Sequence, residues 1–75
     1  MYRLIGTTID NKKIEIAKFR DYKKINTYWS IVENDKRYIE AILLRVIRNE
    51  NPVAIRYREY PEREPKALRR KKWKI

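Results

Sequence analysis

Residues 25–49, INTYWSIVENDKRYIEAILLRVIRN, decide the fold, because they must supply both a strand and a helix. Residues 25–32 are rich in β-branched and aromatic side chains, which predicts a strand. Residues 35–49 carry apolar side chains at the helical spacing i, i+3, i+4 and i+7, which predicts a helix that Asn34 or Asp35 can cap. The apolar positions of that helix are Ile39, Ile42, Leu43 and Val46.

Strands are predicted on both sides of this stretch. Residues 2–9 and 13–20 alternate in polarity and are joined by Asp and Asn at residues 10–12, which tolerate the left-handed geometry of a hairpin turn. Residues 53–60 follow Pro52, which cannot continue a helix. Their apolar side chains are expected to face the core and their arginines to face solvent. The expected inward set is Val53, Ile55 and Tyr57.

The predicted order is β-β-β-α-β, with the first three strands in a meander. This order indicates an α+β domain over residues 1–60, in which one helix packs on a mostly antiparallel sheet. Trp29 and Tyr57 are expected in its core. Residues 61–75 form a basic C-terminal arm that two prolines, Pro61 and Pro65, separate from the domain.

The composition argues against an enzyme. The chain has no histidine and no cysteine, so Ser-His and Cys-His nucleophiles, disulfides and thiolate metal sites are excluded. Gly6 is the only glycine, which excludes a glycine-rich phosphate loop. Acids near a lysine, such as Glu15 and Lys18 with Asp10 or Asp21, arise by chance in so charged a chain. We expect no catalysis, no cofactor and no metal.

The net charge of +10 favours an anionic partner, and residues 61–75 carry half of it with seven Lys and Arg against two Glu. In a nucleic-acid-binding arm the cations would neutralise phosphates and the indole would stack on a base. The alternatives are a solvated terminus with its Trp packed against the domain, or an arm that lies on an anionic bilayer. The residues concerned are Lys66, Arg69, Arg70, Lys71, Lys72, Trp73 and Lys74.

Two further surfaces are candidates for binding. Arg56 and Arg58, on the outer face of the last strand, could join Arg3, Lys13 or Lys18 of neighbouring strands in a basic sheet surface that suits RNA or single strands. The outer side of the predicted helix exposes an apolar spot that could form a homodimer or dock a partner. Its residues are Arg37, Ala41, Leu44 and Arg48.

The sequence therefore predicts a small non-catalytic nucleic-acid-binding protein, with RNA favoured slightly over DNA. The alternative is a protein-interaction module that binds or inhibits an acidic protein partner. Size and charge resemble those of ribonucleoprotein accessory and mobile-element proteins, although the aromatic signatures of RNA-recognition domains are missing. The longest apolar run, residues 41–44, is too short for a membrane span, so we expect a cytoplasmic location. The absence of glutamine and the single methionine resemble the composition of heat-adapted proteins, whereas the five asparagines argue against such an origin.

Overall fold

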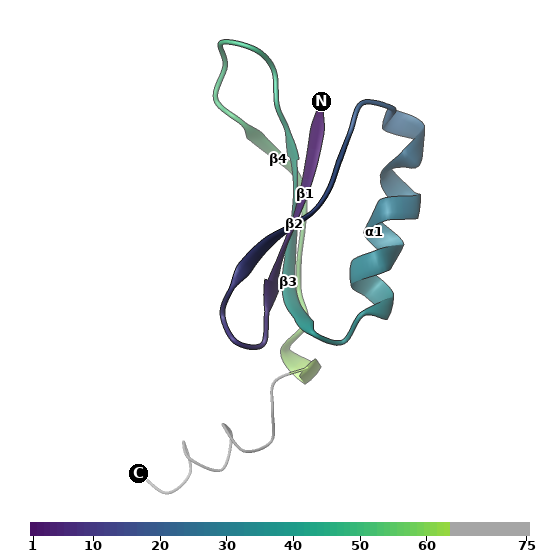
Figure 1. Cartoon of the computed structure of the whole chain (residues 1–75), viewed down its shortest axis with the longest axis vertical. Coiled ribbons are helices and arrows are strands. Elements are labelled where there is room, and N and C mark those ends of the chain that lie inside the picture. The colour runs from purple at the N-terminus through teal and green to yellow at the C-terminus, as the bar shows by residue number, and fades with distance from the viewer. Residues whose placement is uncertain (64–75) are drawn as a thin grey trace, which may run out of the picture.

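The structure, a computed structural model, describes residues 1–63. Four antiparallel strands form one sheet, and a single helix lies along one face of it (Figure 1). Short 3-10 turns precede the helix and follow the last strand. The elements are β1 (Tyr2–Thr8), β2 (Lys13–Phe19), η1 (Tyr22–Lys24), α1 (Ile25–Asn34), β3 (Tyr38–Arg45), β4 (Val53–Glu59) and η2 (Pro61–Arg63). The predicted α+β class, with one helix on a mostly antiparallel sheet, is confirmed.

The sheet has the order β2-β1-β3-β4, which places β1 and β3 in its centre. The β1–β2 hairpin turns through Asn11, whose φ of 63° is the left-handed geometry predicted there. Both β2 and β3 run antiparallel to β1, so they are parallel to each other and need a crossover between them. The helix α1 makes that crossover. The prediction of a meander over the first three strands is therefore wrong.

The predicted helix and third strand are exchanged. Residues 25–34 form α1, because Ile25, Trp29 and Val32 hold the buried positions i, i+4 and i+7 of one helix face. Residues 38–45 form β3, a central strand with a neighbour on either side. Such a strand reads as a near-continuous apolar run that also fits helical spacing. Asp35 consequently ends α1 as its C-cap instead of starting a helix.

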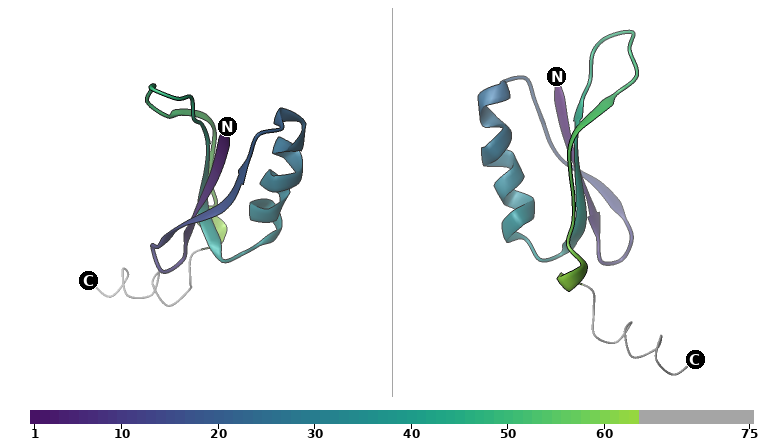
Figure 2. Two further views of the ribbon diagram at one scale, coloured as in Figure 1. Left: turned by 45° about the horizontal axis from the view of Figure 1, so that its top comes forward. Right: turned by 180° about the vertical axis from the view of Figure 1, so that it is seen from behind.

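The core lies between α1 and the sheet face that it covers (Figure 2). Leu4 of β1 and Leu43 of β3 are cross-strand partners beneath the helix, and both are almost fully buried. Trp29 is buried as predicted. The whole cluster is Leu4, Phe19, Ile25, Trp29, Val32, Tyr38, Ala41, Leu43 and Tyr60.

Gly6 is required by close packing at the centre of β1. A Cβ placed on Gly6 would lie 2.6 Å from Cδ1 of Tyr38 and 2.7 Å from Cδ1 of Ile16. These separations are shorter than van der Waals contact, so any side chain at this position would require Tyr38 and Ile16 to shift.

The side-chain directions of β4 are the reverse of those predicted. Arg56 and Arg58 stand opposite the buried Leu43 and Ala41 of β3, so both arginines lie on the helix side of the sheet. Val53, Ile55 and Tyr57 are exposed by 49%, 41% and 51%, so none of the three is in the core. The strand β4 is at the edge of the sheet, and α1 does not extend far enough across the sheet to cover it. The long side chains of Arg56 and Arg58 fill the space between α1 and β4.

Candidate nucleic-acid interface

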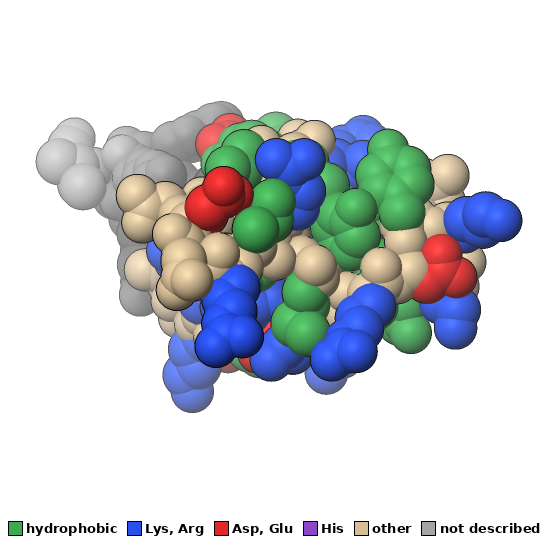
Figure 3. Space-filling view, turned by 90° about the horizontal axis from the view of Figure 1, so that it is seen from above, with side chains coloured by type: hydrophobic (Ala, Val, Ile, Leu, Met, Phe, Trp, Pro, Cys, Tyr) green, Lys and Arg blue, Asp and Glu red, His purple; other side chains and the backbone are tan. Residues whose placement is uncertain are grey.

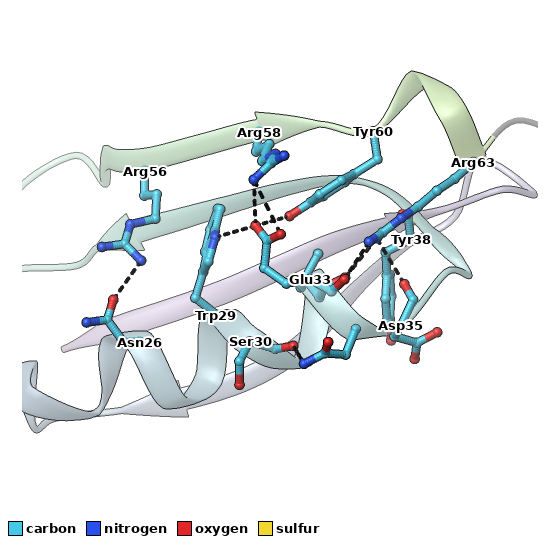
Figure 4. Close-up of polar contacts among 12 residues, drawn as sticks. Asn26, Trp29, Ser30, Glu33, Asp35, Tyr38, Arg56, Arg58, Tyr60 and Arg63 are labelled. Carbon is cyan, nitrogen blue, oxygen red and sulfur yellow. Dashed lines mark hydrogen bonds and ion pairs between the residues drawn. The ribbon is translucent and has the colours of Figure 1, made fainter.

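Three arginines line the seam between α1 and the β4 edge, and each lies over an aromatic ring (Figure 4). The guanidinium carbon of Arg56 is 5.2 Å from the Trp29 ring centroid. Those of Arg58 and Arg63 are 5.1 Å and 3.9 Å from the Tyr60 ring centroid. All three distances are within the range of cation–π attraction. The polar partners of the three differ, and these partners decide how much charge each arginine can offer to a ligand.

Arg63 is committed to the fold. Its guanidinium donates to main-chain carbonyls at the C-terminal end of α1 and in the turn to β3, where the helix dipole favours a cation. The contacts are Nη2 to Glu33 O at 2.6 Å and Nη1 to Val32 O, Tyr38 O and Asp35 O at 2.8, 3.0 and 3.1 Å. The sequence places Arg63 in the C-terminal arm, but these bonds attach it to the domain.

Arg58 is neutralised by the carboxylate of Glu33, at 3.2 Å from Nη1 to Oε1. The same carboxylate accepts hydrogen bonds from the Tyr60 hydroxyl at 2.7 Å and from Trp29 Nε1 at 3.0 Å. The Tyr60 hydrogen bond is the main cause of a Glu33 pKa below its ordinary 4.5, and the charge of Arg58 adds to it. Burial is the main cause that raises the pKa of Tyr60 to about 12. This network joins α1 to β4.

Arg56 differs from Arg58 because its polar partner carries no charge. Its Nη1 donates to the neutral amide oxygen of Asn26 at 3.1 Å, and no carboxylate of residues 1–63 forms an ion pair with it. The Trp29 ring and the Asn26 amide therefore orient this guanidinium without neutralising it. Of the three seam arginines, Arg56 is the best placed to contact a phosphate.

Arg56 borders a hollow of about 310 Å³ whose other walls are Tyr22, Lys23, Ile25 and Asn26. The ring of Tyr22 is exposed by 67%. The carboxylate of Asp21 caps η1 by accepting from the Lys23 amide nitrogen at 2.9 Å, which fixes the turn that presents Tyr22 and Lys23. A base can stack on a flat exposed ring and a phosphate can be contacted by neighbouring cations, so the chemistry of this hollow suits a nucleotide.

The hollow belongs to a basic end of the domain, where β1 begins, β2 and β3 end and α1 starts. Figure 3 views this end, and its Lys and Arg side chains are spread among apolar ones. Within residues 1–63, none of the cations at this end forms an ion pair. We call the following set the basic end: Arg20, Lys23, Lys24, Arg45, Arg48 and Arg56. The acids near it are Asp21 and Glu50.

The predicted basic sheet surface is not assembled. Arg56 and Arg58 lie on the helix side of the sheet, whereas Arg3, which pairs with Lys18 across the strands, lies on the other side. Lys13 is likewise on that other side, opposite Thr7. The sheet thus separates the two groups of cations that the sequence predicted to act together.

The predicted dimer surface is not assembled either. Ala41 is fully buried in β3, and Leu44 is half-buried on the sheet face away from α1. Arg37 forms a 2.7 Å ion pair with Asp35 in the turn after α1, and Arg48 lies in the β3–β4 connection. The four were expected together on a helix that does not exist at that place in the chain.

The arm residues Lys66, Arg69, Arg70, Lys71, Lys72, Trp73 and Lys74 lie outside the described residues. The chain enters them from Arg63, at the end of the sheet opposite the basic end (Figure 1).

Tyr22, Lys23, Lys24 and Asn26 are not among the candidate binding residues predicted from the sequence. A signal was present, because Tyr22, Lys23 and Lys24 follow one another and interleave an aromatic ring with cations. The contribution of Asn26 is visible only in the fold, because its partner Arg56 is thirty residues away in the chain.

Within residues 1–63, no helix has both the length and the apolar character needed to cross a membrane. Comparisons with protein-family models, with curated proteins and with solved structures found no significant match to this chain.

Proposed function

We propose that this chain is a non-catalytic nucleic-acid-binding protein that holds a single strand, RNA in preference to DNA, at its basic end. The observation that carries the proposal is the hollow in which the exposed Tyr22 ring lies beside Lys23 and Arg56, with no carboxylate paired to either cation within residues 1–63.

In this proposal Tyr22 stacks on a base while Lys23, Lys24 and Arg56 contact the adjoining phosphates. The first turn of α1 supports anion binding there, because the helix begins without a side-chain cap and its dipole is positive at that end. Neutralisation of three phosphates on a single strand predicts a slope of log K against log salt of about −2. A steeper slope would measure the contribution of the basic residues at 66–74.

The proposal is tested by the fluorescence anisotropy of labelled ten-nucleotide RNA, ten-nucleotide DNA and a ten-base-pair duplex. Lys23→Gln with Arg56→Gln is expected to weaken RNA binding about tenfold or more at 0.1 M salt, because two phosphate contacts are lost. The matched control is Lys12→Gln with Lys36→Gln, which removes the same charge at the other end of the domain and should change affinity less than about twofold. Equal losses in the two double variants would contradict a site at the basic end.

An acidic protein partner is the alternative, and Tyr22 distinguishes the two. Stacking contributes about 1–3 kcal/mol per base, so Tyr22→Leu should weaken RNA binding by about tenfold, whereas Tyr22→Phe should preserve it. An acidic protein surface needs the cations but no flat ring. RNA binding that is insensitive to Tyr22→Leu would therefore remove the main support for a nucleic-acid ligand.

A further inference from the structure

The face of the sheet away from α1 is uncovered by any element of residues 1–63 (Figure 2). We call it the open face. The strand register sorts its side chains into three rows that cross the sheet from β2 to β4. The first row is Lys18, Arg3, Leu44 and Ala54; the second is Glu15, Ile5, Ile42 and Tyr57; the third is Lys13, Thr7, Glu40 and Glu59.

The centre of the open face is apolar. Ile5, Ile42 and Leu44 lie there side by side on the two central strands, and each remains partly accessible. A solvent-facing side of an antiparallel sheet normally carries polar side chains, so an apolar centre indicates a surface that another layer covers.

The charges on this face disfavour nucleic acid as that layer. Glu40 and Glu59 lie next to each other in the third row, and the Tyr57 hydroxyl is 3.0 Å and 2.7 Å from their carboxylate oxygens. The Glu59 hydrogen bond is the main cause that raises the pKa of Tyr57. Arg3 is itself neutralised by Glu15 at 3.2 Å. Within residues 1–63 neither Glu40 nor Glu59 forms an ion pair, so phosphates would be repelled at that edge of the face.

We propose that the open face binds a second copy of the chain, with the two-fold axis parallel to the strands. That rotation places β2 of one copy over β4 of the other and keeps each row opposite the same row. Lys13 then faces the partner's Glu59, and Ile5 faces the partner's Ile42. Each charge pair and each apolar pair occurs twice by symmetry.

The other face-to-face arrangement has its axis across the strands and is disfavoured by charge. It places Glu15 opposite the partner's Glu15 and Lys13 opposite the partner's Lys18. Both arrangements keep the strands of the two sheets aligned, as in the usual packing of two sheets, whose strands lie within about 30° of each other. The charge pairs therefore decide between them.

The area of the open face sets the expected affinity of the dimer. Four strands at about 4.8 Å spacing and about 23 Å long present on the order of 450 Å² per copy, which is at the low end for specific association. The dimer should therefore be in equilibrium with the monomer and should be sought at concentrations up to on the order of 500 μM.

The arrangement has a consequence that rests on the proposed function. A two-fold axis along the strands points the basic ends of both copies in the same direction. One single strand could then contact both hollows, and the second contact would gain from a high effective concentration.

The test is a charge exchange in the full-length, nuclease-treated protein, measured by sedimentation equilibrium. Lys13→Glu and Glu59→Lys should each weaken the dimer about tenfold, because each turns two attractive pairs into repulsive ones. The variant with both changes should dimerise as the wild type does. Lys36→Glu changes charge by the same amount outside the three rows and should have no effect.

The proposal is overturned if the wild type is a monomer throughout the concentration series, or if the double variant fails to recover. It is also overturned if Lys36→Glu weakens association as much as Lys13→Glu. Loss of RNA affinity in Tyr57→Glu with no change in mass would instead assign the open face to nucleic acid. The sedimentation experiments contain no nucleic acid, so their outcome is independent of the proposed function.

Discussion

The three seam arginines show that residue type alone does not decide the role of a cation. Arg63 is bound by main-chain carbonyls, Arg58 by the Glu33 carboxylate and Arg56 only by a neutral amide. The sequence assigned Arg56 and Arg58 the same role and placed Arg63 in the arm. The difference comes from carbonyl groups and side chains more than twenty residues away in the chain, and no pattern near the arginines predicts it.

Arg63 is expected to stabilise the domain. Arg63→Ala removes charge-assisted hydrogen bonds to the carbonyls at the end of α1, which should lower the free energy of unfolding by about 2–3 kcal/mol. Arg63→Lys keeps the charge but loses the planar fork, and should recover only part of that loss. Urea unfolding followed by circular dichroism measures all three proteins. The exposed neighbour supplies a control in Glu62→Ala, and an Arg63→Ala protein as stable as that control would show that the contacts contribute nothing.

At the scale of elements, the fold class and three strands could be predicted because their patterns are local. The strands predicted over residues 2–9, 13–20 and 53–60 match β1, β2 and β4 to within a residue at each end. For the other two elements the sequence did not show which is the helix and which is the strand. In both segments the composition and the periodicity of the apolar residues indicated different structures. In α1 the helical spacing of Ile25, Trp29 and Val32 overrode a strand-like composition, whereas in β3 pairing on both sides overrode an apparent helical spacing.

The attachment of α1 to β4 should depend on pH through Glu33. Its pKa is lowered in the folded state, so its stabilising effect is complete above its ordinary value of 4.5 and is lost as the pH falls through the lower folded value. We expect Glu33→Gln to lower the free energy of unfolding by about 1–2 kcal/mol at pH 7, because the hydrogen bonds to the carboxylate weaken. At pH 3 the decrease should be much smaller.

Urea unfolding of the wild type and of Glu33→Gln between pH 7 and pH 3 measures this difference. Glu50→Gln, which alters an exposed carboxylate in the β3–β4 connection, is the matched control. If the difference in free energy of unfolding between the wild type and Glu33→Gln stays constant over this range, the charge of Glu33 does not hold the network together.

At the scale of the whole molecule, charge is distributed along the strand direction. Six cations and two carboxylates gather where α1 begins, whereas the acids Asp35, Glu40 and Glu59 lie toward the other end. The net charge predicted an anionic partner, but its placement could not be predicted while α1 was assigned to the wrong segment. Only with α1 over residues 25–34 does Lys23 come beside Arg56.

The most direct test of a nucleic-acid site at the basic end is a titration of the ¹⁵N-labelled full chain with a ten-nucleotide single-stranded RNA, followed by amide chemical shifts. The largest shifts within residues 1–63 are predicted at residues 20–26 and 45–56, around the hollow, with little change at residues 35–40. Shifts at residues 35–40 and none around the hollow, or no shifts within residues 1–63 at all, would contradict the account.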